Sequence, residues 1–170
     1  MVFHSKNSIT FVYTNIVYTI MNIENEIKNT SPLSLSTRTV NNLMYTARQI
    51  EEIAAAKFKE YDLTSQQYNV MRILRGQKGN PANLSTIQER MIDKSSNTTR
   101  LIDKLIQKGF AKRQICKKNR RKIEVFITEN GLELLKKLDP LTEQANKNIM
   151  EKLSINEKEK LNSLLDKLRN

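Results

Sequence analysis

The chain has 170 residues, enough for one domain of ordinary size, and 38% of them are hydrophobic, enough to bury a core. A net charge of +11 points to a polyanionic partner, although charge alone does not separate DNA from RNA, a ribosome or a membrane surface. The single cysteine excludes an intrachain disulfide framework, and no hydrophobic run approaches the length of a membrane span, so we expect a cytoplasmic protein.

The first 32 residues are expected to form a disordered N-terminal extension. Residues 9–20 are the only hydrophobic stretch that resembles a targeting segment, but polar residues interrupt it and no small-residue cleavage site follows. We therefore favour Met21 as the true start, with residues 1–20 an upstream extension or a disordered tail. The polar segment 22–32 ends in Ser31-Pro32 and is expected to be an unstructured lead-in.

Residues 33–62 are predicted to form a long amphipathic helix. Its hydrophobic residues recur on one face, at positions 43, 47, 50, 54, 58 and 61. Thr64 and Gln67 are spaced as a capping box and predict a second helix that ends at Gly76. The segment from Gly76 to Asn83 is predicted to be a loop.

The pattern of the next 25 residues is typical of a helix-turn-helix. Ser85 and Gln88 are spaced as another capping box, which predicts a short helix to about Met91. After a tight turn, Asp93 is expected to cap a helix from Lys94 to Lys108, and Gly109 suits a left-handed conformation beyond its end. Four residues of this helix are predicted to face the core: Thr98, Leu101, Ile102 and Leu105.

Residues 110–128 are predicted to form a β-hairpin whose tip carries five cations: Lys117, Lys118, Arg120, Arg121 and Lys122. From Leu84 to Thr128 the chain has twelve basic and four acidic residues, so most of the excess positive charge lies in about a quarter of its length. A merely solvated basic surface would be more evenly spread, so we interpret this region as a nucleic-acid footprint. In a winged helix, the helix enters a major groove while such a tip reaches phosphates or the minor groove.

Residues 129–170 are predicted to form two amphipathic helices. Thr128 is expected to cap the first, and Pro140 to kink it without ending it. Ser154 and Glu157 are spaced as a capping box for the second.

The outer helices of the chain need a surface that covers their hydrophobic faces, because a lone winged helix needs only the middle of the chain. A two-fold homodimer would supply this surface and present two recognition helices to half-sites about 34–36 Å apart. The alternative is a monomer whose outer helices fold back on their own domain.

The predicted fold is therefore mainly α with a small β-hairpin wing. A winged helix-turn-helix at 63–128 lies between dimerisation helices at 33–62 and 129–170. Ten residues on the recognition helix and the wing are expected to contact DNA: Ser96, Asn97, Thr99, Arg100, Lys104, Lys117, Lys118, Arg120, Arg121 and Lys122.

The expected contacts differ in kind. Asn97 is suited to reading adenine and Arg100 to reading guanine, although Arg100 could equally pair with Asp103, three residues later. Arg121 is expected in or near the minor groove, where negative potential attracts a guanidinium group; the alternative is a tie to the protein's own backbone. Lys104 and the other wing cations are better suited to phosphates than to bases.

Four stretches of the chain, in this order, resemble the MarR family of bacterial transcriptional regulators. They are residues 63–68 (LTSQQY), 99–105 (TRLIDKL), 108–113 (KGFAKR) and 119–131 (NRRKIEVFITENG). The last is similar to the family's wing signature D-x-R-x-x-x-V-x-L-T-x-x-G, in which Arg121 matches the arginine. Asn119 stands where the family usually has Asp, which replaces an electrostatic anchor by a neutral hydrogen bond and implies a looser, more cationic wing tip.

This resemblance extends from about Leu33 to the C-terminus. It implies a homodimer with interlocking terminal helices that binds double-stranded DNA, commonly as a repressor on a palindromic operator. It also implies that a small aromatic molecule could release the DNA, and that redox-sensing members carry their thiol in the N-terminal helix. This chain has no cysteine there, and we interpret Cys116 as an ordinary strand residue, although its basic neighbours would suit a redox switch.

The sequence offers little support for catalysis, a metal or a cofactor. One histidine and one cysteine cannot build a histidine-based triad or a typical zinc site, and the four glycines do not form a phosphate-binding loop. Five helical residues suit either a small-molecule pocket or, as the default, the core: Tyr45, Phe58, Tyr61, Tyr68 and Met71.

Three functions fit the charge pattern. The first is a dimeric, ligand-responsive, nucleoid-associated DNA-binding regulator. The second is a basic protein that binds RNA or the ribosome, and the third is a winged-helix module that binds an acidic protein. The terminal helices favour the first function, because they suit a dimer, and of the three functions only binding to a palindromic operator calls for a dimer.

Overall fold

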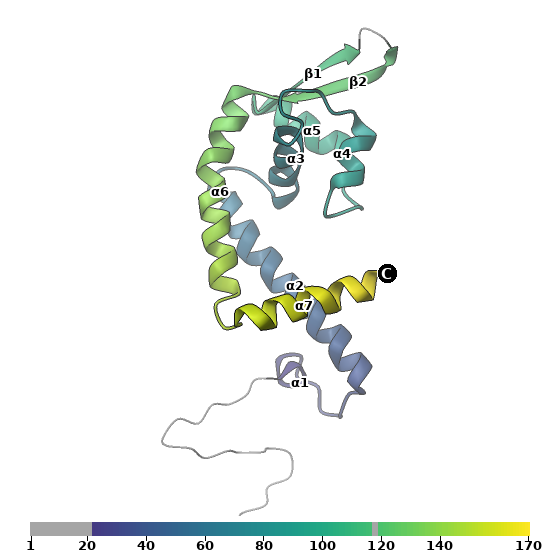
Figure 1. The fold of residues 1–170 in the computed structure, drawn as a ribbon, viewed down its shortest axis with the longest axis vertical. Coiled ribbons are helices and arrows are strands. Elements are labelled where there is room, and N and C mark those ends of the chain that lie inside the picture. Colours follow the sequence, from purple (N-terminus) through teal and green to yellow (C-terminus); the bar gives the residue numbers. More distant parts are fainter. Residues whose placement is uncertain (1–21, 117–118) are drawn as a thin grey trace, which may run out of the picture. The chain divides into compact units, whose positions relative to one another are not determined.

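The computed structural model describes residues 22–116 and 119–170, with the backbone alone described for residues 119–121. The expectation for residues 1–20 lies outside the described residues. In chain order the elements are α1 (Ile23–Glu26), α2 (Leu35–Lys59), α3 (Ser65–Arg75), α4 (Leu84–Arg90), α5 (Thr98–Gln107), β1 (Ala111–Cys116), β2 (Asn119–Ile127), α6 (Glu129–Ile149) and α7 (Ile155–Arg169) (Figure 1). The chain divides into two compact units within α2, between Ala47 and Arg48.

The N-terminal unit contains a short helix where an unstructured lead-in was predicted. The side chain of Asn22 accepts a hydrogen bond from the Asn25 N–H and caps α1. Glu24 pairs with Arg38 of α2, and Tyr45 donates a hydrogen bond of 2.8 Å to Glu26. The expectation for residues 22–32 is therefore wrong where α1 forms, because carboxylates of α1 find cationic and hydroxyl partners on α2.

The second unit begins with the C-terminal half of α2 and is organised around α3. The predicted capping box is present: Thr64 accepts from the Gln67 N–H, and the Gln67 side chain accepts from the Thr64 N–H. The rings of Phe58 and Tyr68 stack with centroids 4.6 Å apart, which joins α2 to α3. Val70 and Met71 of α3 are fully buried, so this helix forms the centre of the core.

The helix-turn-helix forms as predicted, but both of its helices begin at other residues. Asn83, not Ser85, caps α4: its side-chain oxygen accepts from the Thr86 N–H at 2.8 Å, and the Ser85 hydroxyl donates to the same oxygen. Asn97, not Asp93, caps α5, which begins at Thr98 instead of Lys94. The turn between the two helices is therefore longer than the sequence pattern indicated.

A glycine ends α5 and leads directly into the hairpin. Gly109 has a φ of +74°, a left-handed conformation that costs glycine little. Its N–H donates to the Ile106 carbonyl, and the Phe110 N–H donates to the Leu105 carbonyl, which completes a Schellman motif. β1 and β2 then pair antiparallel, with Arg113 opposite Val125 and Ile115 opposite Ile123.

The base of the hairpin is held from two sides. Ala82, in the segment predicted to be a loop, forms an antiparallel bridge with Val125, with N···O distances of 2.9 and 2.8 Å. On the other side, Gly131 in the first turn of α6 lies so close to the Phe110 carbonyl that a Cβ atom there would be only 2.4 Å from it. The wing therefore starts from a fixed base.

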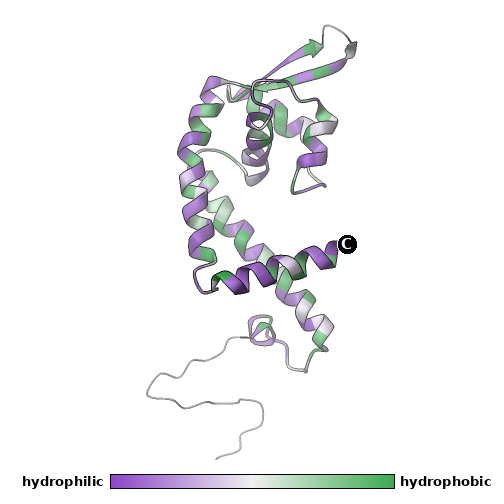
Figure 2. Cartoon of the chain, in the orientation of Figure 1, coloured by the Kyte–Doolittle hydropathy of each residue, from purple (hydrophilic) through white to green (hydrophobic). Residues whose placement is uncertain are grey.

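Helices α6 and α7 follow the hairpin, as predicted. Thr128 caps α6, and Ser154 with Glu157 forms the expected capping box of α7. α6 runs through Pro140 without ending, and its two buried leucines, Leu135 and Leu138, join the core. Figure 2 shows hydrophobic and hydrophilic residues alternating along both helices. The expected fold, mainly α with a small β-hairpin wing, is confirmed.

Candidate nucleic-acid interface

The helix α5 separates a buried face from an exposed one. Thr98, Ile102 and Leu105 are buried, as predicted, while Leu101 is half-buried. On the other side, Thr99, Arg100 and Lys104 are exposed. The burial of the first set orients the helix, so that the second set forms a face available to a ligand.

The N-terminus of α5 uses two of the predicted contact residues for its own structure. The side-chain oxygen of Asn97 accepts a hydrogen bond of 3.0 Å from the Arg100 N–H. The Ser96 hydroxyl donates to Asp93 at 2.8 Å, and Asp93 also accepts from the N–H and the hydroxyl of Ser95. Because the oxygen of the Asn97 side chain caps the helix, only its NH₂ group is left for an external partner. Bidentate recognition of adenine needs both the oxygen and the NH₂ group.

Polar side chains of α3 and α4 hold the turn in front of α5. Asn69 accepts a hydrogen bond of 3.0 Å from the Ile92 N–H. Gln88 donates to the Lys94 carbonyl at 2.7 Å and accepts from the Thr98 hydroxyl. The sequence analysis did not assign these supporting roles to Asn69 and Gln88. The sequence signal for them is one amide side chain among the hydrophobic positions of each helix.

An ion pair joins the recognition helix to the wing. Asp103 of α5 lies 2.7 Å from Arg113 of β1. The carboxylate that was considered as a partner for Arg100 is therefore paired elsewhere, and the structure shows no ion pair of Arg100 with any residue that it describes. Arg100 is thus a free cation on the exposed face of α5 within the described part of the chain.

Cross-strand pairs cover the outer face of the hairpin. Lys112 lies over the ring of Phe126, 5.8 Å from its centroid, and Gln114 donates to Glu124 at 2.8 Å. Hydrogen bonds from Gln114 and Cys116 lower the pKa of Glu124. Cys116 is half-buried in this ladder. This environment fits the interpretation of Cys116 as an ordinary strand residue.

The wing tip is only partly described. Lys117 and Lys118 lie outside the described residues, and for Arg120 and Arg121 only the backbone, in β2, is described. Lys122 is exposed and lines a hollow of about 250 Å³ between β2 and the start of α4, together with Asn83, Leu84, Ser85 and Ile123. The predicted roles of the tip cations remain predictions.

Three of the four acidic residues of this region, Asp93, Asp103 and Glu124, have partners within the protein. Hydrogen bonds from Ser95 and Ser96 lower the pKa of Asp93, so it stays ionised at neutral pH. Asp103 is paired with Arg113 and Glu124 with Gln114. Because these acids are directed to internal partners, the exposed cations Arg100, Lys104 and Lys122 give this surface its positive character.

The aromatic residues considered for a pocket belong mainly to the core. Phe58, Tyr68 and Met71 are buried and Tyr61 packs against them, which matches the default interpretation. Beside them, an open pocket of about 220 Å³ lies between α3 and α6, lined by Tyr68, Arg72, Asp139, Thr142, Glu143 and Asn146. Except for Tyr68, the sequence analysis did not single out these lining residues.

Among the described residues, no helix is both long and hydrophobic enough to cross a membrane. No group of three or more histidine, cysteine or acidic side chains among them could hold a metal ion.

Comparison with known proteins agrees with the geometry. The MarR family model matches residues 63–123. The helix-turn-helix-type transcriptional regulator YkoM of Bacillus subtilis is 30% identical over 122 residues, which cover 71% of this chain and 77% of YkoM.

Two solved structures extend this similarity. The crystal structure of a MarR transcription factor from Planctomyces limnophilus is 30% identical, with a TM-score of 0.63, over 80% of this chain and 98% of that one. Bordetella bronchiseptica BpsR, whose DNA binding is regulated by 6-hydroxynicotinic acid, is 22% identical with a TM-score of 0.71, over 82% of this chain and 99% of that one. The chain belongs to the MarR family of DNA-binding, winged helix-turn-helix transcriptional regulators.

Proposed function

We propose that this protein is a homodimeric repressor that binds a palindromic operator through α5 and the wing of each copy. The observation that carries the proposal is the exposed cationic face of α5, next to a wing that Arg113 ties to the same helix. The polar supports of the turn fix the N-terminus of α5 before any ligand arrives, which lowers the ordering cost of binding.

Each predicted contact has a role that its surroundings allow. Arg100 suits a guanine edge or a phosphate, and Thr99 and Lys104 suit phosphates or base edges beside it. Asn97 can donate its NH₂ group while its oxygen caps the helix. The Ser96 hydroxyl already donates to Asp93. We propose that its oxygen accepts a hydrogen bond from the DNA, or that Ser96 affects binding only by shaping the turn before α5. For the wing cations we propose contacts with phosphates and with the minor groove.

The proposal of a homodimer rests on hydrophobic side chains that a single chain leaves exposed. On α7, Ile155 is 74% exposed, Leu164 53% and Leu168 68%, and no residue of this helix is buried. Burial of one such side chain stabilises an interface by about 1.5–3 kcal/mol, so a helix with this face is stable only when something covers it. A second copy is the partner that also explains a two-fold operator.

We further propose that a small aromatic molecule releases the DNA, by analogy with BpsR and its 6-hydroxynicotinic acid. The pocket between α3 and α6 is the candidate site, because an aromatic residue, Tyr68, and a cationic residue, Arg72, both line it. A screen of aromatic acids and phenols would test this: a binder should raise the unfolding temperature and weaken operator binding.

The proposed function can be tested by fluorescence anisotropy with duplexes from the region upstream of the gene, with random duplex and with structured RNA. We expect a preference for a duplex with an inverted repeat, and a fall of log K by about 0.9 per neutralised phosphate per decade of salt. The variant Arg100→Ala should weaken operator binding, whereas Lys136→Ala, which removes a cation from α6, should not. Equal affinity for random duplex, or a preference for RNA, would contradict the proposal and favour the other functions.

A further inference from the structure

The surroundings of α6 change in the middle of the helix. Before Pro140, Gly131, Leu135 and Leu138 are buried against the winged helix. From Leu141 to Arg169, all of which the structure describes, no residue is fully buried. The winged-helix body thus ends at Asp139, and the second half of α6 together with α7 forms a C-terminal arm (residues 141–169).

At the junction between body and arm, a proline interrupts the backbone hydrogen bonds of α6. Pro140 has no N–H, so the carbonyl four residues earlier, that of Lys136, loses its helical hydrogen bond, and the proline ring crowds the same carbonyl. The Thr142 hydroxyl bonds to the Leu138 carbonyl at 2.9 Å, a contact that often accompanies helix bending. Bending of α6 is therefore expected at this point.

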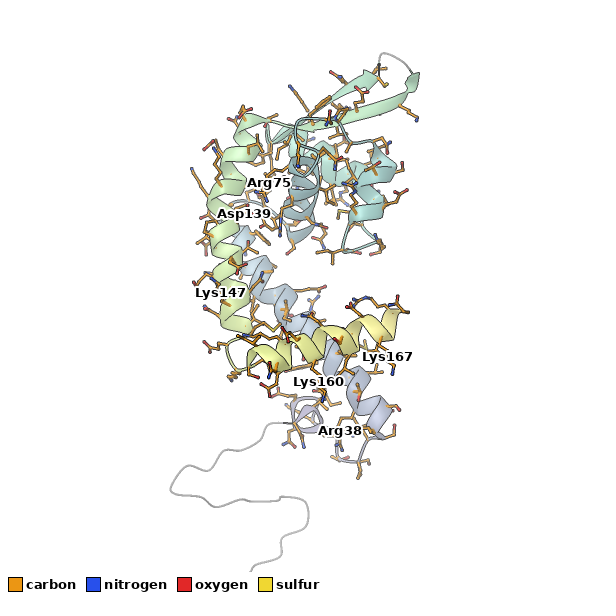
Figure 3. All side chains as sticks on the ribbon, in the orientation of Figure 1. Arg38, Arg75, Asp139, Lys147, Lys160 and Lys167 are labelled. Atoms are coloured by element: carbon orange, nitrogen blue, oxygen red, sulfur yellow. The ribbon has the colours of Figure 1, made fainter. Side chains whose placement is uncertain are left out.

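A polar tie from α3 holds the last residue of the body, Asp139, directly before this junction. Asp139 accepts a hydrogen bond of 2.8 Å from the Tyr68 hydroxyl and forms an ion pair with Arg75, whose side chain lies close to it in Figure 3. Arg72 lies over the Tyr68 ring, 5.8 Å from its centroid. Burial opposes ionisation of Asp139, but the hydrogen bonds from Arg75 and Tyr68 outweigh it and lower the pKa of its carboxyl group. Asp139 is thus held from two positions on α3, one residue before the proline at which the helix is expected to bend.

We propose that Asp139 is a positioning residue: its tie to Tyr68 and Arg75 fixes the direction in which the arm leaves the body at Pro140. This inference rests on the proposed function, because the arm would join the two copies of the dimer. The tie would then set the distance between the two recognition helices and restrict the protein to operators with one spacing of their half-sites. Asp139 would then influence which operators are bound without itself contacting the DNA.

The test is a series of inverted-repeat duplexes whose central spacer is shortened or lengthened one base pair at a time. Each added base pair moves a half-site by about 3.4 Å and rotates it by about 35°, so a rigid dimer must discriminate. We expect the wild type to prefer one spacing at least about tenfold, a difference of about 1.4 kcal/mol. With Asp139→Asn, the preference should fall to less than about threefold, while affinity for a duplex with a single half-site stays within about twofold of wild type.

Matched variants separate positioning from general damage. Glu133→Gln removes an exposed carboxylate of α6 that pairs with Lys136 on the same helix, and it should retain the wild-type spacing preference. Pro140→Ala restores the missing N–H and stiffens the helix, so the double variant D139N/P140A should regain part of the preference. If Asp139→Asn does not fold, Tyr68→Phe, which removes a single hydroxyl from the tie, replaces it in the same series.

The outcomes distinguish the two proposals. If the wild type shows no preference for inverted repeats, the proposed function itself fails. If the wild type discriminates between spacings and Asp139→Asn does so equally well, the positioning role is wrong. A variant that loses affinity for the single half-site in parallel with its spacing preference would show a structural role alone, and would also overturn the inference.

Discussion

The carboxylate of Asp103 on α5 accepts a hydrogen bond of 2.7 Å from the guanidinium group of Arg113 on β1. The two side chains are 44% and 53% exposed, so their ion pair adds at most about 1 kcal/mol to stability. Its consequence is geometric and electrostatic: it ties the wing to α5 and keeps a negative charge on the surface that we propose to face DNA.

The variant Asp103→Asn separates these two effects. We expect the free energy of unfolding to fall by less than about 1 kcal/mol, because the pair is exposed. Affinity for random duplex should rise, and its salt dependence should steepen by about one phosphate equivalent, because Arg113 becomes free to contact DNA. Chemical denaturation and a salt titration of binding measure both. Glu133→Gln breaks an exposed pair on α6 with the same charge change and serves as the control; a similar gain in that variant would refute the local explanation.

Asn97 allows helix capping to be distinguished from DNA contact. Asn97→Ala removes the cap of α5 and should lower the free energy of unfolding by about 1 kcal/mol. Asn97→Asp keeps a capping oxygen and should stay close to wild type in stability, but it adds a negative charge at the proposed interface. Weaker DNA binding by Asn97→Asp at unchanged stability would support the contact. Wild-type binding by this variant would leave Asn97 with a capping role alone.

The elements of this fold were predictable where their signals are local. The caps of α3 and α7 follow from residues three positions apart, and the hairpin from two short strands around a cationic tip. The predicted starts of α4 and α5 were wrong because each region offers two capping side chains. The bridge between Ala82 and Val125 places Asn83 before α4, and Asn69 holds Ile92, which lengthens the turn.

The residues around the site that escaped the sequence analysis depend on contacts between distant positions. Asp139 meets partners 64 and 71 residues earlier in the chain, and nothing near it in the sequence marks it. For Asp103, the sequence analysis considered Arg100, three residues earlier, as a partner, but the structure pairs this carboxylate with Arg113, ten residues later. Periodicity assigned these residues to exposed helix faces, but only packing of the helices selects their partners.

Gly131 is expected to be intolerant of any side chain. A Cβ atom there would lie 2.4 Å from the Phe110 carbonyl and 2.8 Å from a side-chain carbon of Ile127, so backbone must move. Gly131→Ala should therefore lower the free energy of unfolding by about 1–3 kcal/mol. Gly76→Ala, whose nearest contact would be 3.3 Å, should change it by less than about 1 kcal/mol. Denaturant unfolding of both variants provides the comparison, and equal stabilities would show that the wing base can shift freely.

The contact of Asp139 with α3 should weaken in acid. The pKa of Asp139 is lower in the folded protein than its ordinary value of 3.8, so folding favours the ionised carboxylate. Its stabilising contribution is complete above that value and is lost as the pH falls through the lowered pKa. Asp139→Asn should thus have a smaller loss of stability than the wild type between pH 4 and pH 2, roughly. Parallel acid dependence of the two proteins would show that the carboxylate contributes nothing to folding.

The exposed hydrophobic face of α7 provides a direct test of the homodimer. Leu164 and Leu168 are four residues apart and lie on one side of the helix, where charges would be costly in an interface but harmless in water. The variant L164K/L168K should therefore sediment as a monomer and lose cooperative operator binding, while its circular dichroism remains close to wild type. Ile92 is 88% exposed in the turn before α5, so Ile92→Lys adds a similar charge outside the proposed dimer interface and should leave the mass unchanged. If L164K/L168K keeps the wild-type mass, α7 does not join the two copies, and the source of the two-fold arrangement must be sought in α2.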